Sequence, residues 1–352
     1  MTLSACSPGC RACQKGEWLC IFLTYLCSAD CPSCPAPFKG QDRIVSSLGT
    51  NPEEIAAHLP EARFSGIAFS GGDCFLVYDR LLDWLSFFRT RFPRYYYWAY
   101  TNGLQVTERQ LRTAAERGLN EIRFNISASG YNSSRLTRLM KAAAGFFDHV
   151  TVEIPAIPED VDQVVKVLPD LARAGVHFLN LHEFFITEKQ KPSRAAFAKR
   201  HVLNEVSELW YDVRSRSTMR KIQAVCRKEK IPLRVHLCTL GRKDIQMRRR
   251  RQTMGRLLRE PWERLAAGGF LETLLPLPDS LSAEDCLSRL RKQGGTDEFK
   301  PLFLNPARAG LRPPGFQGRL FRLSFLPPLE VGGERTLLRF ERLRPTRGVF
   351  FP

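Results

Sequence analysis

Short apolar runs alternate with longer amphipathic segments over the first half of the chain. Six runs have the length of buried strands: Leu19–Thr24, Gly66–Ser70, Tyr96–Thr101, Glu121–Ile126, Val150–Ile154 and Phe178–Leu181. Five segments between them have a helical period: Pro52–Leu59, Tyr78–Arg91, Thr107–Arg117, Ser134–Phe147 and Asp160–Ala174. Strands that recur every roughly 25–45 residues predict successive βα units and a parallel sheet.

Helix-end signals agree with this pattern. Thr107 and Gln110 have the spacing of a capping box, which satisfies free backbone amides at a helix start. Gly118 and Gly175 follow helical segments, where glycine closes a helix at low steric cost. A seventh strand is expected to end at Cys238.

Beyond Trp262 the composition changes. Proline, glycine and leucine dominate Leu274–Leu281 and Pro301–Gly318. We expect two strands, a turn and a helix there: Leu320–Phe325, Thr336–Phe340, Glu330–Glu334 and Ala283–Lys292. The chain is therefore divided into a Cys-rich segment (1–20), a barrel (21–240), and a basic helix with a small α+β extension (241–352).

Composition narrows the class of protein. The chain has 352 residues, of which 43% are hydrophobic and 25% charged, as in globular proteins. Its longest apolar stretch, Trp18–Leu26, is too short to span a bilayer, and no secretory signal opens the chain. Seven of the eleven cysteines precede residue 35, which indicates metal ligation in a reducing, cytoplasmic compartment.

Three of these cysteines follow the first apolar run directly. Cys27, Cys31 and Cys34 form a Cys-x3-Cys-x2-Cys motif in a short loop. Three thiolates at this spacing can hold three irons of a 4Fe–4S cluster and leave the fourth iron open. The alternative is a zinc site, although structural zinc sites usually pair Cys-x2-Cys knuckles and fill four positions.

This motif resembles that of the radical S-adenosylmethionine (SAM) superfamily, except that Ser33 replaces the aromatic residue that commonly precedes the last cysteine. The resemblance implies a partial (β/α)6 TIM-like barrel. It also implies that the open iron binds SAM and that reductive cleavage gives a 5′-deoxyadenosyl radical, which takes hydrogen from a substrate. An electron donor such as flavodoxin or ferredoxin would supply the electron.

Polar residues at the strand ends are candidate SAM contacts. Gly71, Gly72 and Asp73 resemble the superfamily's GGE motif, which holds the amino group of SAM, and Thr101 begins a frequent TNG ending. We expect further contacts at Asn125, Ser127 and Glu153, and substrate contacts at His182 and Glu183. The alternatives are an ordinary Gly-Gly turn and polar groups satisfied within the protein.

A second cysteine trio lies upstream and repeats the spacing of the first. Cys6, Cys10 and Cys13 predict a second 4Fe–4S cluster or a zinc site, with Cys238 as the favoured fourth ligand and Cys20 as the alternative. Together with Lys243-Asp244, these cysteines resemble a largely archaeal branch similar to pyruvate formate-lyase activating enzymes. Three points stay open: which metal the upstream site holds, which residue is its fourth ligand, and what the site does. It would relay electrons, stabilise the structure or bind the substrate.

Charge adds one further function class. The net charge is +17, and arginines concentrate at Arg248–Arg251. This pattern is typical of a solvated basic helix or of RNA binding, but no RNA-binding motif accompanies it. We expect a peptide, protein or small-metabolite substrate, with an RNA-modifying enzyme as one alternative. A non-enzymatic protein that binds zinc and nucleic acid is the other.

Overall fold

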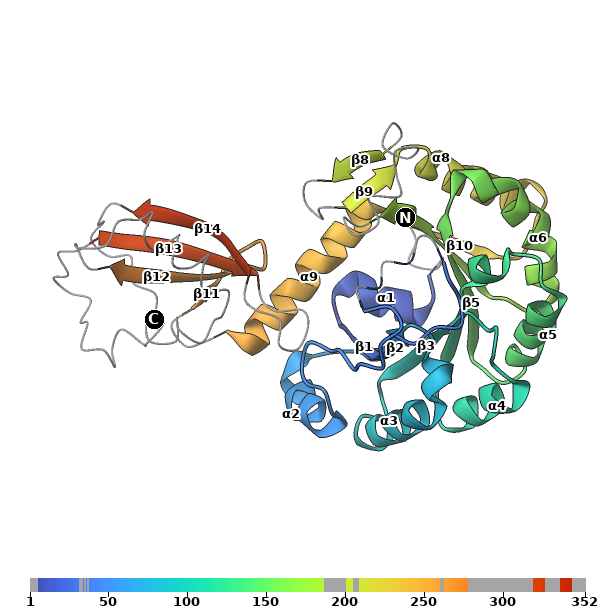
Figure 1. Cartoon of the computed structure of the whole chain (residues 1–352), viewed down its shortest axis with the longest axis horizontal. Helices are drawn as coiled ribbons and strands as arrows, with labels where there is room; N and C mark the ends of the chain where they lie inside the picture. Colours follow the sequence, from blue (N-terminus) through green and yellow to red (C-terminus); the bar gives the residue numbers. More distant parts are fainter. Residues whose placement is uncertain are drawn as a thin grey trace. The chain divides into compact units, whose positions relative to one another are not determined.

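A parallel sheet of seven strands organises the first part of the computed structural model (Figure 1). Its strands are β1 (Trp18–Thr24), β2 (Gly66–Gly71), β3 (Tyr96–Thr101), β4 (Glu121–Phe124), β5 (His149–Ala156), β6 (Phe178–Glu183) and β10 (Arg234–Cys238). They pair in the order β1-β2-β3-β4-β5-β6-β10. β1 and β10 are the two edges, so the sheet curves as an open, partial barrel.

The structure describes residues 6–31, 34, 36, 38–186, 201–204, 209–259, 263–277, 319–326 and 336–343. The chain forms two compact units. The first comprises residues 1–57 and 64–246 and contains the parallel sheet, and the second comprises 58–63 and 247–352.

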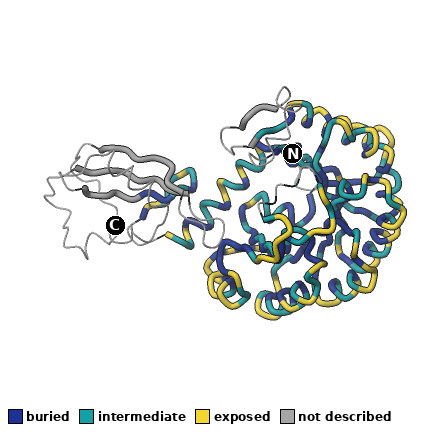
Figure 2. Tube along the Cα trace, in the orientation of Figure 1, coloured by how far each residue is buried: buried dark blue, intermediate teal, exposed yellow. Residues whose placement is uncertain are grey.

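Helices follow most strands and lie on the outside of the sheet (Figure 1). They are α2 (Pro52–Ala62), α3 (Tyr78–Arg91), α4 (Glu108–Glu116), α5 (Ser134–Ala143), α6 (Val161–Arg173) and α8 (Ser215–Lys228). Buried positions line the strands, and exposed positions lie on the outer turns of the helices (Figure 2). Parallel strands covered on both faces are nearly continuous apolar runs, which is why the sequence predicts all seven.

The helix-start and helix-end signals predicted from the sequence are confirmed. The Thr107 side chain accepts from the Gln110 backbone amide, and the Gln110 side chain accepts from the Thr107 amide, so both halves of the capping box are present. Gly118 and Gly175 have φ values of 96° and 77°, which only glycine adopts freely.

The Cys-rich segment contains a helix that the sequence reading did not predict. α1 (Pro8–Lys15) begins at Ser7, whose hydroxyl accepts from the Cys10 amide, and ends at Gly16 with φ 76°. It packs against β1, β2 and β3 inside the curve of the sheet (Figure 1). A Cβ on Gly9 would lie 2.5 Å from the Arg123 Nη2 atom, so no side chain fits at this contact.

The fourth strand is shorter than expected. β4 ends at Phe124, and Asn125 caps the short 3₁₀ helix Ile126–Ser129. The expectation that this strand reaches Ile126 is therefore wrong, and Asn125 and Ser127 belong to the turn that follows it. An asparagine side chain that bonds a backbone amide two residues later favours a turn over a strand.

A small antiparallel sheet also went unpredicted. It consists of β7 (Phe185–Ile186), β9 (Leu209–Asp212) and β8 (His201–Asn204), in that order. These strands are too short for their hydrophobic pattern to be recognised. The unpredicted α8 follows them in the chain.

α9 (Leu240–Leu258) runs across the boundary between the two units in the sequence. In the second unit, β11 (Arg264–Leu265), β12 (Leu271–Leu277), β13 (Arg319–Leu326) and β14 (Thr336–Leu343) form an antiparallel sheet in chain order. The two strands expected after residue 319 are present. The helix expected at Ala283–Lys292 and the turn at Glu330–Glu334 lie outside the described residues. Within the described ranges, no helix is long and apolar enough to cross a membrane.

Candidate cluster and cofactor site

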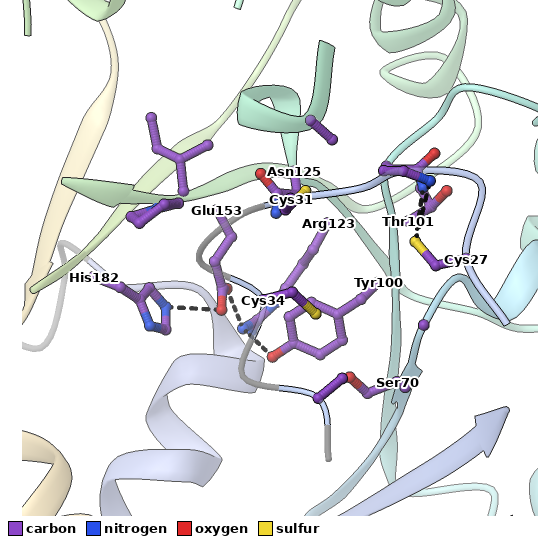
Figure 3. A pocket seen from close by; sticks show the side chains of 18 of the residues that line it. Cys27, Cys31, Cys34, Ser70, Tyr100, Thr101, Arg123, Asn125, Glu153 and His182 are labelled. Carbon is purple, nitrogen blue, oxygen red and sulfur yellow. Dashed lines mark hydrogen bonds and ion pairs between the residues drawn. The ribbon is translucent and has the colours of Figure 1, made fainter. Parts of the chain in front are cut away.

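A cavity of about 420 Å³ opens at the carboxyl ends of the parallel strands, where ligands bind in folds of this kind. The loop after β1 forms one wall of it (Figure 3). The cavity brings together ten of the residues singled out from the sequence: Cys27, Cys31, Cys34, Gly71, Gly72, Thr101, Asn125, Glu153, His182 and Glu183. Asp73 and Ser127 are not among the residues that line it.

The cysteine loop presents its three thiols to this cavity. Cys27 is exposed, and Cys31 and Cys34 are partly exposed. Burial raises the pKa of Cys31, and the neighbouring Cys27 and Cys34 raise it further. Asn102 donates from Nδ2 to the Cys27 Sγ over 3.4 Å.

The thiols are arranged for a cluster more readily than for one ion. Among the described residues, no three His, Cys, Asp or Glu side chains converge on a point that could hold a single metal ion. A 4Fe–4S cluster takes each thiolate on a separate iron, so its ligands do not need to meet at one point. The three thiols beside an open cavity therefore fit a cluster with one free iron.

The two glycines after β2 hold the cysteine loop against the sheet. The Gly72 amide donates to the Thr24 carbonyl over 2.7 Å, and the Asp73 amide donates to the Leu26 carbonyl over 2.8 Å. A Cβ on Gly71 or Gly72 would lie 1.9 Å from the same carbonyl oxygens. Glycine is therefore required at both positions for a packing reason, besides any role in binding a ligand.

Asp73 has a structural role in this turn. Its Oδ2 accepts from the Thr101 hydroxyl over 2.8 Å and from the Asn102 amide over 3.0 Å, while Oδ1 accepts from the Phe75 amide. Burial raises the pKa of this carboxyl, although the three hydrogen bonds oppose the shift. The side chain is 2% exposed, so its carboxylate fixes the end of β3 instead of facing the cavity.

Asn125 and Ser127 bond chiefly to each other. The Ser127 hydroxyl donates to the Asn125 Oδ1 over 2.6 Å, and the Ser127 amide donates to the same oxygen over 3.1 Å. Asn125 lines the cavity, whereas Ser127 does not. The structure therefore keeps Asn125 as a candidate contact and places Ser127 behind it.

Glu153 is the centre of a charged network at the base of the cavity (Figure 3). Its Oε1 lies 2.8 Å from the His182 Nε2, and its Oε2 accepts from Arg123 over 2.9 Å and from Asn180 over 3.0 Å. Burial alone would raise the pKa of Glu153, but His182 and Arg123 hold it below its usual range. The carboxylate is therefore ionised at neutral pH.

Arg123 connects this network to the inside of the barrel. It donates to Glu121 over 2.8 Å, to the Tyr100 hydroxyl over 3.0 Å and to the Ser7 hydroxyl over 3.1 Å. The side chain is 3% exposed, so two carboxylates balance one buried guanidinium. A buried charge requires such pairing.

The upstream cysteines contact residues of β6, β10 and α9. The Cys6 Sγ lies 3.1 Å from the His236 Nδ1, the Asn180 Nδ2 lies 3.1 Å from the Cys10 Sγ, and the Cys13 Sγ lies 3.4 Å from the Gln246 Oε1. Burial raises the pKa of Cys13, and Cys10 and Cys238 raise it further. Cys238 follows His236 by two residues in β10, so the two side chains lie on the same face of the strand that Cys6 contacts.

Cys20 has a different position. It lies in β1 and lines the cavity that the three catalytic-motif cysteines border. The fourth ligand of the upstream trio stays a prediction, with Cys238 favoured and Cys20 as the alternative.

Three site residues were missed or left without a role from the sequence. Asn102 was recognised only as part of the TNG ending, and its bond to Cys27 spans 75 positions of sequence. Lys243 lines the cavity from the start of α9, whereas in the sequence it was singled out only as part of the Lys243-Asp244 pair. His236 meets Cys6 across 230 positions, and no local pattern signals such a contact.

Comparisons with known proteins agree with the cluster assignment. The model of the family described as "4Fe-4S single cluster domain" matches residues 3–142. A protein of Methanocaldococcus jannaschii named "Putative glycyl-radical enzyme activating enzyme MJ0021" is 27% identical over 277 residues, which cover 75% of this chain and 71% of that protein.

Two solved structures show a weak overall likeness. SuiB of Streptococcus suis bound to its precursor peptide SuiA has a TM-score of 0.47 and 11% identity, and SuiB bound to S-adenosylmethionine has 0.45 and 11%. Both matches cover 64% of this chain, which spans about half the length of the SuiB chains (49% and 50%). These scores are too low to support an inference about function.

Proposed function

We propose that this chain is a radical SAM enzyme that reductively cleaves S-adenosylmethionine at the loop formed by Cys27, Cys31 and Cys34. The match to the 4Fe-4S single cluster domain and the likeness to a protein named as an activating enzyme support this proposal. The observation that carries the proposal is the meeting of this loop with the Gly71-Gly72 turn at one cavity. Three thiols beside a cavity and a close-packed glycine turn are what a cluster with one free iron requires. When bound, the cluster and SAM supply one-electron cleavage chemistry.

The residues of the chain would orient the cofactors and exclude water. Asn102 donates to the Cys27 sulfur, and hydrogen bonds to ligand sulfurs tune a cluster's reduction potential. The backbone of Gly71 and Gly72 lines the cavity without side chains, so the amino group of SAM can approach it closely. The Asp73 carboxylate supports this arrangement from behind, through Thr101 and Asn102.

Glu153 has one acceptor site left for a ligand. A carboxylate offers about four lone-pair positions, and His182, Arg123 and Asn180 occupy three of them. A ribose hydroxyl of SAM is a donor that fits the fourth. Asn125 lies at the same cavity and is a further candidate for the ribose or carboxylate of SAM.

For the substrate we propose a peptide or protein. The curated relative is named as an activating enzyme of glycyl-radical enzymes, whose substrates are proteins. Lys243 and the aromatic residues Phe184 and Phe185 also line the cavity, so a substrate segment that enters it would contact them beside SAM. An electron donor such as flavodoxin or ferredoxin would reduce the cluster.

The test is formation of 5′-deoxyadenosine from SAM by anaerobically reconstituted protein with dithionite. Wild-type protein and the Cys226→Ala variant, which alters a buried thiol of α8, should both form the product. Cys31→Ala should form none. Product formation by Cys31→Ala equal to that of wild type, or none by wild type, would overturn the proposal.

A further inference from the structure

The upstream cysteines lie close to the SAM cavity, and their contacts continue into it. We propose that Cys6, Cys10, Cys13 and Cys238 hold a second 4Fe–4S cluster inside the barrel, adjacent to the SAM cavity, with His236 as a hydrogen-bonding partner of Cys6. The placement of this cluster beside SAM rests on the proposed function, because it assumes that SAM binds in the cavity. Its metal content does not depend on SAM chemistry.

The four thiols come from two segments that the fold brings together. Cys10 and Cys13 are one turn apart on α1, so they share a face of that helix. Cys238 is the last residue of β10 and is 7% exposed. Cys6 precedes the same helix and contacts His236, which is two residues before Cys238 and therefore on the same face of β10.

Three of the four thiols are buried, and the fourth is partly exposed. Cys6, Cys10 and Cys238 are 5%, 7% and 7% exposed, and Cys13 is partly exposed. A chain with four such thiols in one region, none in a disulfide, has the ligand set of a zinc or iron–sulfur site. The Cys-x3-Cys-x2-Cys spacing of Cys6, Cys10 and Cys13 repeats that of Cys27, Cys31 and Cys34, which favours an iron–sulfur cluster over zinc.

Asn180 links this region to the SAM cavity. Its Nδ2 donates both to the Cys10 sulfur over 3.1 Å and to the Glu153 Oε2 over 3.0 Å. The Glu153 carboxylate determines the orientation of the Asn180 side-chain amide, because it attracts the NH₂ group and would repel the amide oxygen. The sulfur of Cys10 therefore receives a donor, which suits a metal-bound thiolate.

The remaining atom of that amide has no partner. The Asn180 Oδ1 is buried in a residue that is 1% exposed, and it accepts no hydrogen bond from any described residue. Buried polar atoms are normally satisfied, so an orphaned acceptor here indicates that a donor is bound between the two sites in the working protein. Water or a hydroxyl group of the ligand in the cavity fits this position.

A second connection runs through Arg123. Its Nη2 donates to the Ser7 hydroxyl that caps α1, while its Nη1 donates to Glu153. The helix that carries Cys10 and Cys13 is therefore tied to the cavity by two independent hydrogen-bonded paths. Neither path would be needed by a metal site that only anchored the amino-terminal segment.

The first experiment removes the catalytic cysteines and counts metals. The Cys27→Ala/Cys31→Ala/Cys34→Ala variant changes a loop at the cavity wall and leaves every upstream ligand in place. After anaerobic reconstitution, wild type should contain about eight irons per chain and this variant about four. The Cys226→Ala control should match wild type. Iron near zero in the triple variant, or zinc in place of iron, would overturn the second cluster.

The second experiment tests where the cluster lies. Two neighbouring reduced clusters interact magnetically, so the electron paramagnetic resonance spectrum of reduced wild type should differ from the sum of two single-cluster spectra. These come from the triple variant and from Cys10→Ala/Cys13→Ala. A spectrum equal to the sum would overturn the placement beside the cavity.

The outcomes also separate this inference from the proposed function. Absence of 5′-deoxyadenosine from wild type, with about four irons in the triple variant, would leave the second cluster and reject SAM cleavage. Normal 5′-deoxyadenosine formation by wild type, with no iron in the triple variant, would leave SAM cleavage and reject the second cluster. If the double upstream variant does not fold, Cys238→Ala supplies the second single-cluster spectrum.

Discussion

The side-chain amide of Asn102 donates a hydrogen bond to the sulfur of Cys27 over 3.4 Å. Asn102 is 6% exposed and follows β3, and its own backbone amide is held by Asp73. The buried Asp73 carboxylate therefore positions a donor to the first cysteine of the motif. If the proposed function holds, the Gly71-Gly72-Asp73 turn would support the cluster through Asn102 besides lining the SAM cavity.

Replacing Asn102 by Ala should keep the iron content and lower the reduction potential of the catalytic cluster. A hydrogen bond to a ligand sulfur stabilises the reduced, more negative state, so its loss makes reduction harder. The rate of 5′-deoxyadenosine formation should fall about 10- to 100-fold, the usual cost of losing such a supporting contact. Potentiometric titration monitored by electron paramagnetic resonance checks the potential. The exposed Asn132→Ala is the control, and an unchanged potential in Asn102→Ala would contradict the account.

Replacing Gly72 by Ala should destabilise the first unit strongly. The new Cβ would lie 1.9 Å from the Leu26 carbonyl oxygen, and backbone must move to relieve this contact. Overpacking of this kind costs about 2–3 kcal/mol, which corresponds to a fall in the melting temperature of about 4–12 °C for a unit of this length.

Gly241→Ala is the matched control for this change. A Cβ there meets no atom within 4 Å, and the residue lies in α9, where alanine is favoured over glycine. Thermal unfolding should show a stability equal to that of wild type or about 0.5–1 kcal/mol higher. Equal melting temperatures for Gly72→Ala and Gly241→Ala would show that the glycine turn is not packed as described.

The strand and helix pattern of the barrel was predictable because each buried strand is an apolar run between helix-cap signals. The cysteine loop was predictable because its ligands lie within eight residues of each other. α1 was missed because its sequence was read only as a cysteine spacing. Its start and stop signals, Ser7, Pro8 and Gly16, were nevertheless present.

Contacts between distant segments could not be predicted in the same way. The pairing of Cys6 with His236 and the bond of Asn180 to Cys10 depend on how β6 and β10 are placed against α1. The role of Asp73 was also hidden, because a motif does not reveal which groups its carboxylate meets. Sequence spacing identifies ligands in one loop, whereas the fold decides which other residues reach them.

Replacing Glu153 by Gln should weaken SAM binding more than it weakens the fold. The amide keeps an acceptor oxygen but places an NH₂ group against Arg123 or His182, so the free acceptor position is lost or misdirected. Loss of one such hydrogen bond should lower kcat/KM for SAM about tenfold, mostly through KM. Steady-state kinetics of 5′-deoxyadenosine formation check this. Glu116→Gln, on the exposed end of α4, should behave as wild type, and an unchanged KM in Glu153→Gln would remove Glu153 from the SAM site.

Acid should destabilise the barrel through His177. Its Nδ1 accepts the Val150 backbone amide over 3.0 Å, so the ring is neutral in the folded state. Burial lowers the pKa of His177, and His149 and Arg234 lower it further, whereas the unfolded chain has a histidine pKa of about 6.5. Below about pH 6.5 the unfolded state therefore binds more protons, and stability falls as the pH falls.

His177→Asn keeps an acceptor oxygen near the same place but does not titrate. Its melting temperature should fall less than that of wild type between about pH 7 and pH 5.5, a window set by the ordinary histidine pKa. The surface variant His58→Asn serves as the control. Parallel pH profiles for wild type and His177→Asn would contradict this assignment.

The central claim is that SAM binds directly to a cluster held by Cys27, Cys31 and Cys34. The most direct measurement is the electron paramagnetic resonance spectrum, with and without SAM, of the reduced Cys10→Ala/Cys13→Ala variant. In this variant the trio Cys27, Cys31 and Cys34 is intact and the upstream trio is not. We predict that SAM changes the g-values of the cluster signal, because the free iron gains the amino and carboxylate groups as ligands. A cluster signal that is identical with and without saturating SAM would contradict the account.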